Sequence, residues 1–150
     1  MSEFEVQRLG LVMQPEAGNP LEVEGVLNPA AAVRGRDGHL YLFPRLVAAG
    51  NYSRIGIARV MFNAAGDPTG VERLGIALQP EADYELRPDG GGCEDPRISF
   101  VEPLRQFVMT YTRIRSTDHA SRLPFPKIYS IGAVWDSPHS LPITVLTSTA

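Results

Sequence analysis

The feature that most constrains this chain is the frequent return of glycine, proline, asparagine and aspartate between short runs of alternating apolar residues. Residues 54–62 alternate with a period of two, which puts Ile55 and Ile57 on one face of an extended strand. No amphipathic helical pattern of twelve residues interrupts these runs. Short strands joined by such turns predict an all-β fold of antiparallel meanders, such as a sandwich, a barrel or a propeller.

The strand signal is concentrated in the middle of the chain. Residues 1–37 contain repeated helix breakers and little regular pattern, so we expect an extended lead-in. Residues 114–150 differ in composition and carry weak strand signals, except over 127–135. The expected strands are 39–43, 54–62, 71–78, 97–101 and 105–112, with turns at 36–38 and 63–70 and a hairpin around 102–104.

Charge and composition exclude several classes of function. A net charge of −3 and an isoelectric point near 5.6 give no basic surface for nucleic acid. The acidic N-terminus and the lack of a long apolar run predict a soluble cytoplasmic protein with no membrane partner. The single cysteine, Cys93, rules out an internal disulfide, and its two acidic neighbours disfavour a reactive thiolate. The histidines lack metal-ligand spacing, so we predict no metal.

The strongest candidate site is the segment from Gly90 to Arg97, which places two adjacent carboxylates and a guanidinium after three glycines. Glycine permits positive φ angles and close backbone approach. Pro96 fixes its own φ and favours an extended conformation at Asp95, so that carboxylate is expected to be held in place. The alternative is a surface turn in which Glu94 and Asp95 are solvated and Arg97 pairs with one of them.

Residues 25–112, a little over half of the chain, resemble the first part of the glycoside hydrolase family 130 enzymes, which include β-mannoside phosphorylases and β-mannosidases. The order and spacing of the matching pieces, together with the Glu-Asp-Pro-Arg motif after a glycine run, carry the resemblance. Those pieces are residues 28–31, 40–45, 51–56, 91–97 and 110–112.

The resemblance implies a five-bladed β-propeller with its site at the central channel and an inverting attack on a terminal β-mannosyl unit. It places the general acid at Asp95. The substrate-binding residues that we expect from the resemblance and the chemistry are Asn28, Arg45, Asn51, Arg54, Glu94 and Arg97.

The nucleophile of this expected reaction is inferred from the number of carboxylates. Inverting hydrolysis needs a second carboxylate to activate water. On an extended backbone Glu94 would point to the face opposite Asp95 and could not serve. Inorganic phosphate is itself a nucleophile and needs only cationic positioning. We therefore expect phosphorolysis to mannose 1-phosphate, with phosphate as co-substrate and no other cofactor, while hydrolysis of the same β-mannosyl oligosaccharides and assembly into a homo-oligomer remain open.

The length of the chain limits this expectation, because 150 residues supply about three propeller blades at most. We therefore expect residues 1–113 to form the N-terminal blades of an incomplete propeller. Residues 114–150 would be a divergent tail, produced by truncation or a frameshift. Two other hypotheses stay open, namely a non-catalytic sugar-binding module and an inactive product that never folds stably.

Aromatic side chains within the strand patterns are expected to fill the core rather than to stack on a sugar. Tyr52 lies in a polar segment, so a ligand contact and a structural role remain equally open for it. The expected core aromatics are Tyr41, Phe43, Phe62, Phe100, Phe107 and Tyr111.

Overall fold

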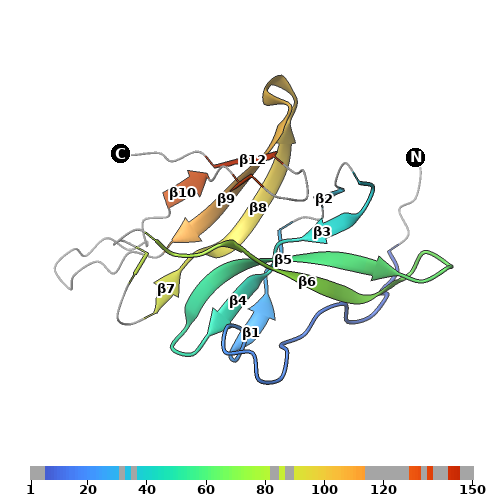
Figure 1. Ribbon diagram of the computed structural model, residues 1–150, viewed down its shortest axis with the longest axis horizontal. Helices are drawn as coiled ribbons and strands as arrows, with labels where there is room; N and C mark the ends of the chain where they lie inside the picture. The colour runs from blue at the N-terminus through green and yellow to red at the C-terminus, as the bar shows by residue number, and fades with distance from the viewer. Residues whose placement is uncertain are drawn as a thin grey trace.

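The computed structural model describes residues 6–30, 33–34, 37–81, 85–86, 90–113, 129–132, 135–136 and 142–145. Within these ranges the chain is all-β, with one short 3₁₀ helix and no α-helix. The described strands form one sheet of seven strands and one of five, most of them paired antiparallel, and over the described residues neither sheet closes on itself (Figure 1). The predicted all-β class is therefore confirmed.

The seven-stranded sheet is built around the long strand β5, which has partners along both edges. β4 and β3 share one edge of β5, and β6 and β7 share the other. β1 extends the sheet beyond β4, and β2 extends it beyond β3. The strands are β1 (Gly25–Leu27), β2 (Val33–Arg34), β3 (Leu40–Leu42), β4 (Arg45–Ala48), β5 (Tyr52–Phe62), β6 (Pro68–Leu78) and β7 (Gly91–Gly92).

The five-stranded sheet is centred on β9. β8 and β10 run antiparallel to β9, and β12 runs parallel to it. The 3₁₀ helix η1 (Glu102–Leu104) closes the hairpin between β8 and β9, where a turn was predicted. The strands are β8 (Glu94–Val101), β9 (Gln106–Arg113), β10 (Tyr129–Gly132), β11 (Trp135–Asp136) and β12 (Pro142–Val145).

The hydrophobic core lies between the two sheets. Tyr41 of β3, Phe43 just after that strand and Ile55 of β5 pack with Met109 and Tyr111 of the second sheet. Phe43 and Ile55 have no exposed surface. β5 is buried at consecutive positions rather than at alternate ones, as expected for a central strand covered on both faces. The sheets are thus held together by apolar burial, and this packing fixes the corner where the chain crosses between them.

The five predicted strands are all present, with ends shifted by a few residues. The expected lead-in is not purely extended, because the chain turns at residues 17–18 and 20–21. It also contains two short strands, β1 and β2, which pair with β4 and β3. The turn predicted over 63–70 is shorter, since Pro68 already begins β6, a first-residue position that proline tolerates. β4 and β7 are too short for a sequence pattern to mark them. They form because β5 offers ladder hydrogen bonds along both edges.

Two of the six aromatic residues expected in the core are exposed. Phe62 is 48% and Phe100 46% exposed, since Phe62 is the last residue of β5 and Phe100 is the last but one of β8, each beside a hairpin turn. Phe100 instead packs edge-on against Phe107, with ring centroids 5.0 Å apart. Tyr41, Phe43 and Tyr111 are buried as predicted, and Phe107 packs against the core.

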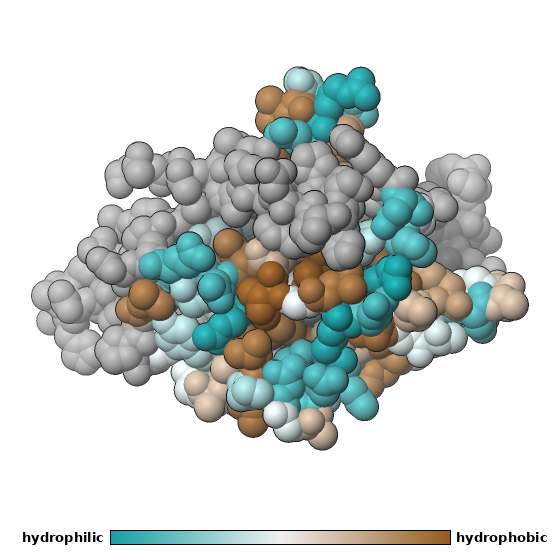
Figure 2. Space-filling model, in the orientation of Figure 1, coloured by the Kyte–Doolittle hydropathy of each residue, from teal (hydrophilic) through white to brown (hydrophobic). Residues whose placement is uncertain are grey.

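The face of the molecule seen in Figure 2 carries polar and apolar residues side by side, with the apolar ones gathered toward its middle. Among the described residues, no helix has the length and apolar character needed to cross a membrane.

Candidate functional site

The candidate site lies at the corner where the chain passes from β7 in the first sheet to β8 in the second. Gly92 makes this corner possible. Its φ angle is +97°, and a Cβ atom there would lie 2.1 Å from the carbonyl oxygen of Ser53. The next amide, that of Cys93, donates to the same oxygen at 3.1 Å. The glycine is thus required by close backbone packing against β5.

Asp95 adopts a left-handed backbone conformation with a φ angle of +45°. The pairing of β8 with β9 is irregular between Glu94 and Arg97, which is a β-bulge. The expectation that Pro96 keeps Asp95 extended is therefore wrong. The expectation that Glu94 and Asp95 point to opposite faces is also wrong, because the bulge breaks the alternation and turns both carboxylates toward one guanidinium.

That guanidinium belongs to Arg45, the first residue of β4. Its Nη2 donates to Glu94 Oε1 at 2.9 Å, and its Nη1 donates to Asp95 Oδ1 at 3.2 Å. Nη2 also donates to Asn51 Oδ1 at 3.1 Å, and Nε donates to Ser53 Oγ at 2.9 Å. Arg45 therefore uses both terminal nitrogens and Nε to join four side chains from two strands and a turn.

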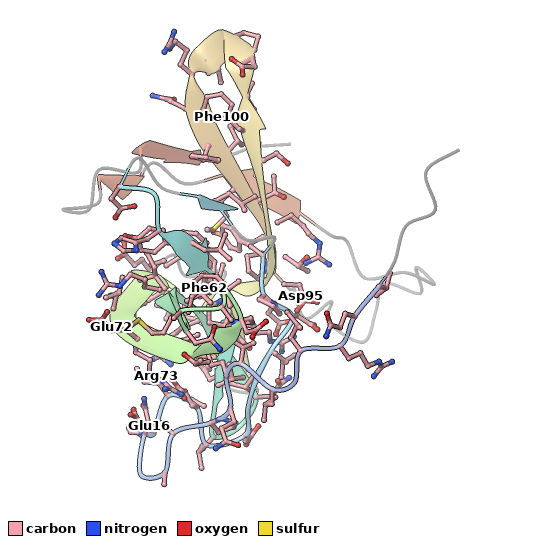
Figure 3. All side chains as sticks on the ribbon, turned by 90° about the vertical axis from the view of Figure 1, so that its right-hand side faces the viewer. Glu16, Phe62, Glu72, Arg73, Asp95 and Phe100 are labelled. Carbon is pink, nitrogen blue, oxygen red and sulfur yellow. The ribbon has the colours of Figure 1, made fainter. Side chains whose placement is uncertain are left out.

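Asn28 completes the cluster from the loop after β1, and its Nδ2 donates to Asp95 Oδ1 at 2.8 Å. Both contacts to the Asp95 carboxylate thus fall on Oδ1. Oδ2 has no hydrogen bond to a described residue. The Asp95 side chain is 34% exposed, whereas that of Glu94 is 4% exposed. Figure 3 shows Asp95 near the base of the β8–β9 hairpin and Phe100 near its tip.

The backbone of this cluster is strained. Asn28, Asn51 and Asp95 have φ angles of +41°, +56° and +45°. The fourth described non-glycine residue with a positive φ, Arg105, lies in the distant β8–β9 turn. Such conformations cost of order 1–3 kcal/mol each and gather at functional sites. In these conformations the side-chain amide of Asn28 donates to Asp95, while the Asn51 amide oxygen and the Asp95 carboxylate accept hydrogen bonds from Arg45.

Arg54 and Arg97 do not join the side-chain cluster. Arg54 pairs in register with Leu46, the neighbour of Arg45, so strand alternation puts it on the other face of the β4–β5 pair. Its guanidinium lies 5.5 Å from the ring centre of Tyr52. The exposed Arg97 folds back so that Nη1 donates to the carbonyl oxygen of Pro96 at 2.8 Å. The alternative in which Arg97 pairs with a neighbouring carboxylate is therefore wrong.

Buried polar side chains also lie next to Cys93, at the corner between β7 and β8. The Glu85 carboxylate accepts a hydrogen bond from the Tyr111 hydroxyl and lies 4.0 Å from Cys93 Sγ. Burial, together with the charge of Glu85, raises the pKa of the Cys93 thiol far above its ordinary value. This thiol does not ionise near neutral pH, in agreement with a structural role. The hydroxyl of Tyr52 donates to the carbonyl oxygen of Glu85 at 3.4 Å.

Two polar residues of the site were not singled out from the sequence. Ser53 is fully buried and orients Arg45, and period-two alternation back from Ile55 places it on the same face. Glu85 is 5% exposed but follows a segment with no strand pattern, so nothing in the sequence indicated that it would enter the core.

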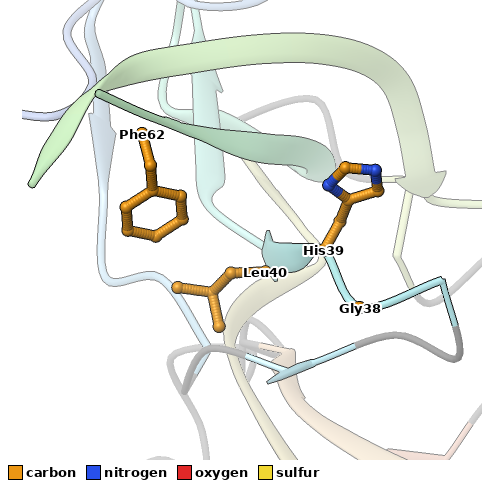
Figure 4. A pocket seen from close by; sticks show the side chains of 4 residues that line it. All are labelled: Gly38, His39, Leu40 and Phe62. Carbon is orange, nitrogen blue, oxygen red and sulfur yellow. The ribbon is translucent and has the colours of Figure 1, made fainter. Parts of the chain in front are cut away.

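A separate hollow of about 330 Å³ is lined by Gly38, His39, Leu40 and Phe62 (Figure 4). It lies toward the Phe62 end of β5, whereas the Asp95 cluster lies at the Tyr52 end. Eleven residues of strand separate the two by roughly 30 Å. Within the described ranges, no three His, Cys, Asp or Glu side chains are grouped so as to hold a metal ion.

The cluster of Asn28, Arg45, Glu94 and Asp95 thus offers one carboxylate oxygen, Asp95 Oδ2, that has no hydrogen bond to a described residue and lies on a carboxylate paired with Arg45. Comparison of the chain with known protein families, with curated proteins and with solved structures found no match.

Proposed function

We propose that this chain is a carbohydrate-active enzyme, or part of one, that cleaves terminal β-mannosides with inversion by transferring the mannosyl group to phosphate. The observation that carries the proposal is the Asp95 carboxyl group. Arg45 and Asn28 occupy Oδ1, and Oδ2 is left for a proton and a leaving oxygen. The resemblance to the β-mannoside phosphorylases supplies the substrate class.

In the proposed reaction Asp95 donates its proton from Oδ2 to the departing glycosidic oxygen, directly or through a sugar hydroxyl. A phosphate oxygen attacks the anomeric carbon from the opposite face, the old C–O bond breaks, and mannose 1-phosphate forms. Asn28 and Arg45 would contact the sugar while they hold the acid, and Asn51 would contact it beside Arg45. Arg97 would stabilise the bulge through its contact with the Pro96 carbonyl.

The position of Glu94 supports phosphorolysis over hydrolysis. A water-activating base stands across the sugar from the acid, roughly 6.5–9.5 Å from it. Glu94 instead shares one guanidinium with Asp95 and is 4% exposed. Its role in the proposal is therefore to orient Arg45. Hydrolysis would need a different carboxylate, and it stays the alternative within the same family.

The pairing pattern is in keeping with the finer fold that we propose, an incomplete five-bladed propeller. β4, β5 and β6 are consecutive antiparallel neighbours, and so are β8, β9 and β10. Consecutive antiparallel strands of this kind make up propeller blades. We further propose that the enzyme works in the cytoplasm, where inorganic phosphate is available as co-substrate.

The deciding experiment incubates the chain with β-mannosyl disaccharides, with and without phosphate, and identifies the products. We expect mannose 1-phosphate only when phosphate is present. Asp95→Asn should lower the rate about 10²- to 10⁴-fold, because it removes the proton donor. Asp67→Asn, in the exposed turn between β5 and β6, is the matched control. An Asp95→Asn rate within a few-fold of wild type would rule out the acid role.

A non-catalytic sugar-binding module is the second candidate. It is favoured by the pairing of both carboxylates, Asp95 and Glu94, with the single Arg45 guanidinium, an arrangement that also suits a fixed hydrogen-bonding surface. In that case the same incubation would give no product, while calorimetry would detect binding of mannosyl disaccharides that Arg45→Ala abolishes.

A further inference from the structure

We propose that Glu24 is a positioning residue for the Asp95 cluster, acting through the turn between β4 and β5. Its role in turnover rests on the function proposed above, whereas its structural role can be tested without substrate. Glu24 lies just before β1, in the lead-in where the sequence shows little regular pattern, and it is exposed. The sequence therefore did not predict that it lies near the site.

The carboxylate of Glu24 holds the turn by two hydrogen bonds. Oε1 accepts from the amide of Gly50 at 2.7 Å, and Oε2 accepts from the amide of Asn51 at 3.0 Å. Both turn residues have positive φ angles, +77° and +56°. The backbone of Glu24 is fixed as well, because its amide donates to the carbonyl oxygen of Val47 at 2.9 Å.

Two paths lead from this turn to Asp95. The side chain of Asn51 accepts a hydrogen bond from Arg45 Nη2, and the same nitrogen contacts Glu94. The carbonyl oxygen of Asn51 accepts from the amide of Gly91 at 3.0 Å, in the strand that leads directly into the Glu94–Asp95 bulge. A shift of the turn would therefore move both Arg45 and the segment that carries the acid.

A carboxylate suits this position because two amides must be satisfied by one side chain. Charge-assisted hydrogen bonds to backbone N–H groups are shorter and about twice as strong as neutral ones. Glutamine offers a single oxygen, and its amide group would face the second donor. A displacement of about 1 Å caused by a remote substitution can cost roughly 100-fold in rate, so a loosened turn should be visible in turnover.

The experiment compares Glu24→Gln and Glu24→Ala with Glu16→Ala as the matched control. Glu16 belongs to the same lead-in, but among the described residues its carboxylate accepts a hydrogen bond only from the side chain of Asn19, at 3.2 Å. NMR would follow the amides of Gly50, Asn51 and Gly91 together with the Nε–H of Arg45. We expect both Glu24 variants to shift all four signals, and the control to leave them in place.

Turnover of β-mannosides is the second readout, and we expect Glu24→Ala to lower kcat about 10- to 100-fold while Glu16→Ala stays within about two-fold of wild type. Shifts confined to Gly50 and Asn51, with Arg45 and kcat unchanged, would overturn the proposal, and so would no shift at all. If the wild-type chain turns over no β-mannoside, the proposed function fails, and the Arg45 signal alone decides the role of Glu24.

Discussion

At the scale of the residue, one arginine organises the candidate site. The Arg45 side chain is 12% exposed and neutralises Glu94, which is 4% exposed. Taking such charges out of water costs several kcal/mol, and good geometry with additional hydrogen bonds is needed to offset that cost. Ser53 and Asn51 supply those additional hydrogen bonds. The arrangement is therefore sensitive to the loss of a single partner.

Replacing Arg45 with methionine should lower the free energy of unfolding by about 3–5 kcal/mol, because it removes the guanidinium that pairs with the buried Glu94 carboxylate. Urea denaturation followed by circular dichroism measures this change. Arg59→Met is the matched control. Arg59 and its partner Glu72 are 32% and 46% exposed, so its loss should cost at most about 1 kcal/mol. Equal costs for the two variants would contradict the importance of burial at Arg45.

At the scale of the element, the lead-in is held against the first sheet by polar contacts. Glu22 is 1% exposed and receives two hydrogen bonds from Arg73 on β6, each 2.9 Å long. Arg73 also donates to the carbonyl oxygen of Gln14 at 2.7 Å. These contacts fix residues 14–22 against β6, and Glu24 then fixes the turn beside the site. The lead-in, in which the sequence shows little regular pattern, thus packs against β6 and also positions the turn beside the site.

The Glu22–Arg73 pair should make stability depend on pH. Burial raises the pKa of Glu22, but the hydrogen bonds from Arg73 and the Glu16 amide, with the charge of Arg73, outweigh it, and the pKa falls below its ordinary value of 4.5. A lowered pKa gives stability that is present above 4.5 and lost as the pH falls through the folded-state value.

We therefore expect Glu22→Gln to be about 2 kcal/mol less stable than wild type at pH 7. This difference should shrink as the pH falls below 4.5. Thermal unfolding of both proteins across this range measures it. A difference that stays constant with pH would show that the charge of Glu22 contributes nothing.

At the scale of the whole molecule, the two sheets contribute residues to one shared hydrophobic core. Tyr41 and Ile55 of the first sheet pack in the same cluster as Ile98 and Met109 of the second. Cys93, fully buried between β7 and β8, belongs to that cluster as well. Residues that share a core of this kind should unfold together.

Ile55→Ala should therefore lower the unfolding midpoint of both sheets equally, at a cost of about 2–5 kcal/mol. Hydrogen exchange of backbone amides in increasing denaturant follows β5 of the first sheet and β9 of the second separately. Coincident midpoints in the variant would support cooperative folding of one unit. Amides of β9 that keep their wild-type midpoint while those of β5 shift would show that the sheets unfold independently.

The sequence by itself determined the all-β class, the position of the five main strands and the segment that carries Asp95. These depend on local properties, namely the alternation of apolar residues and the placement of glycine and proline, which act over a few residues. The same local rules failed at Asp95, since proline preference and strand alternation predicted an extended residue with Glu94 on the opposite face.

Only the tertiary structure decided the site. The contacts of Arg45 with Glu94 and Asp95 join residues 49 and 50 positions apart, and that of Asn28 with Asp95 spans 67 positions. The left-handed backbone at Asp95 is tolerated because the Gly92–Ser53 packing and the pairing of β8 with β9 hold the chain on both sides of it. Such long-range packing outweighs a local preference of about 1–3 kcal/mol, and it leaves no periodic signal in the sequence.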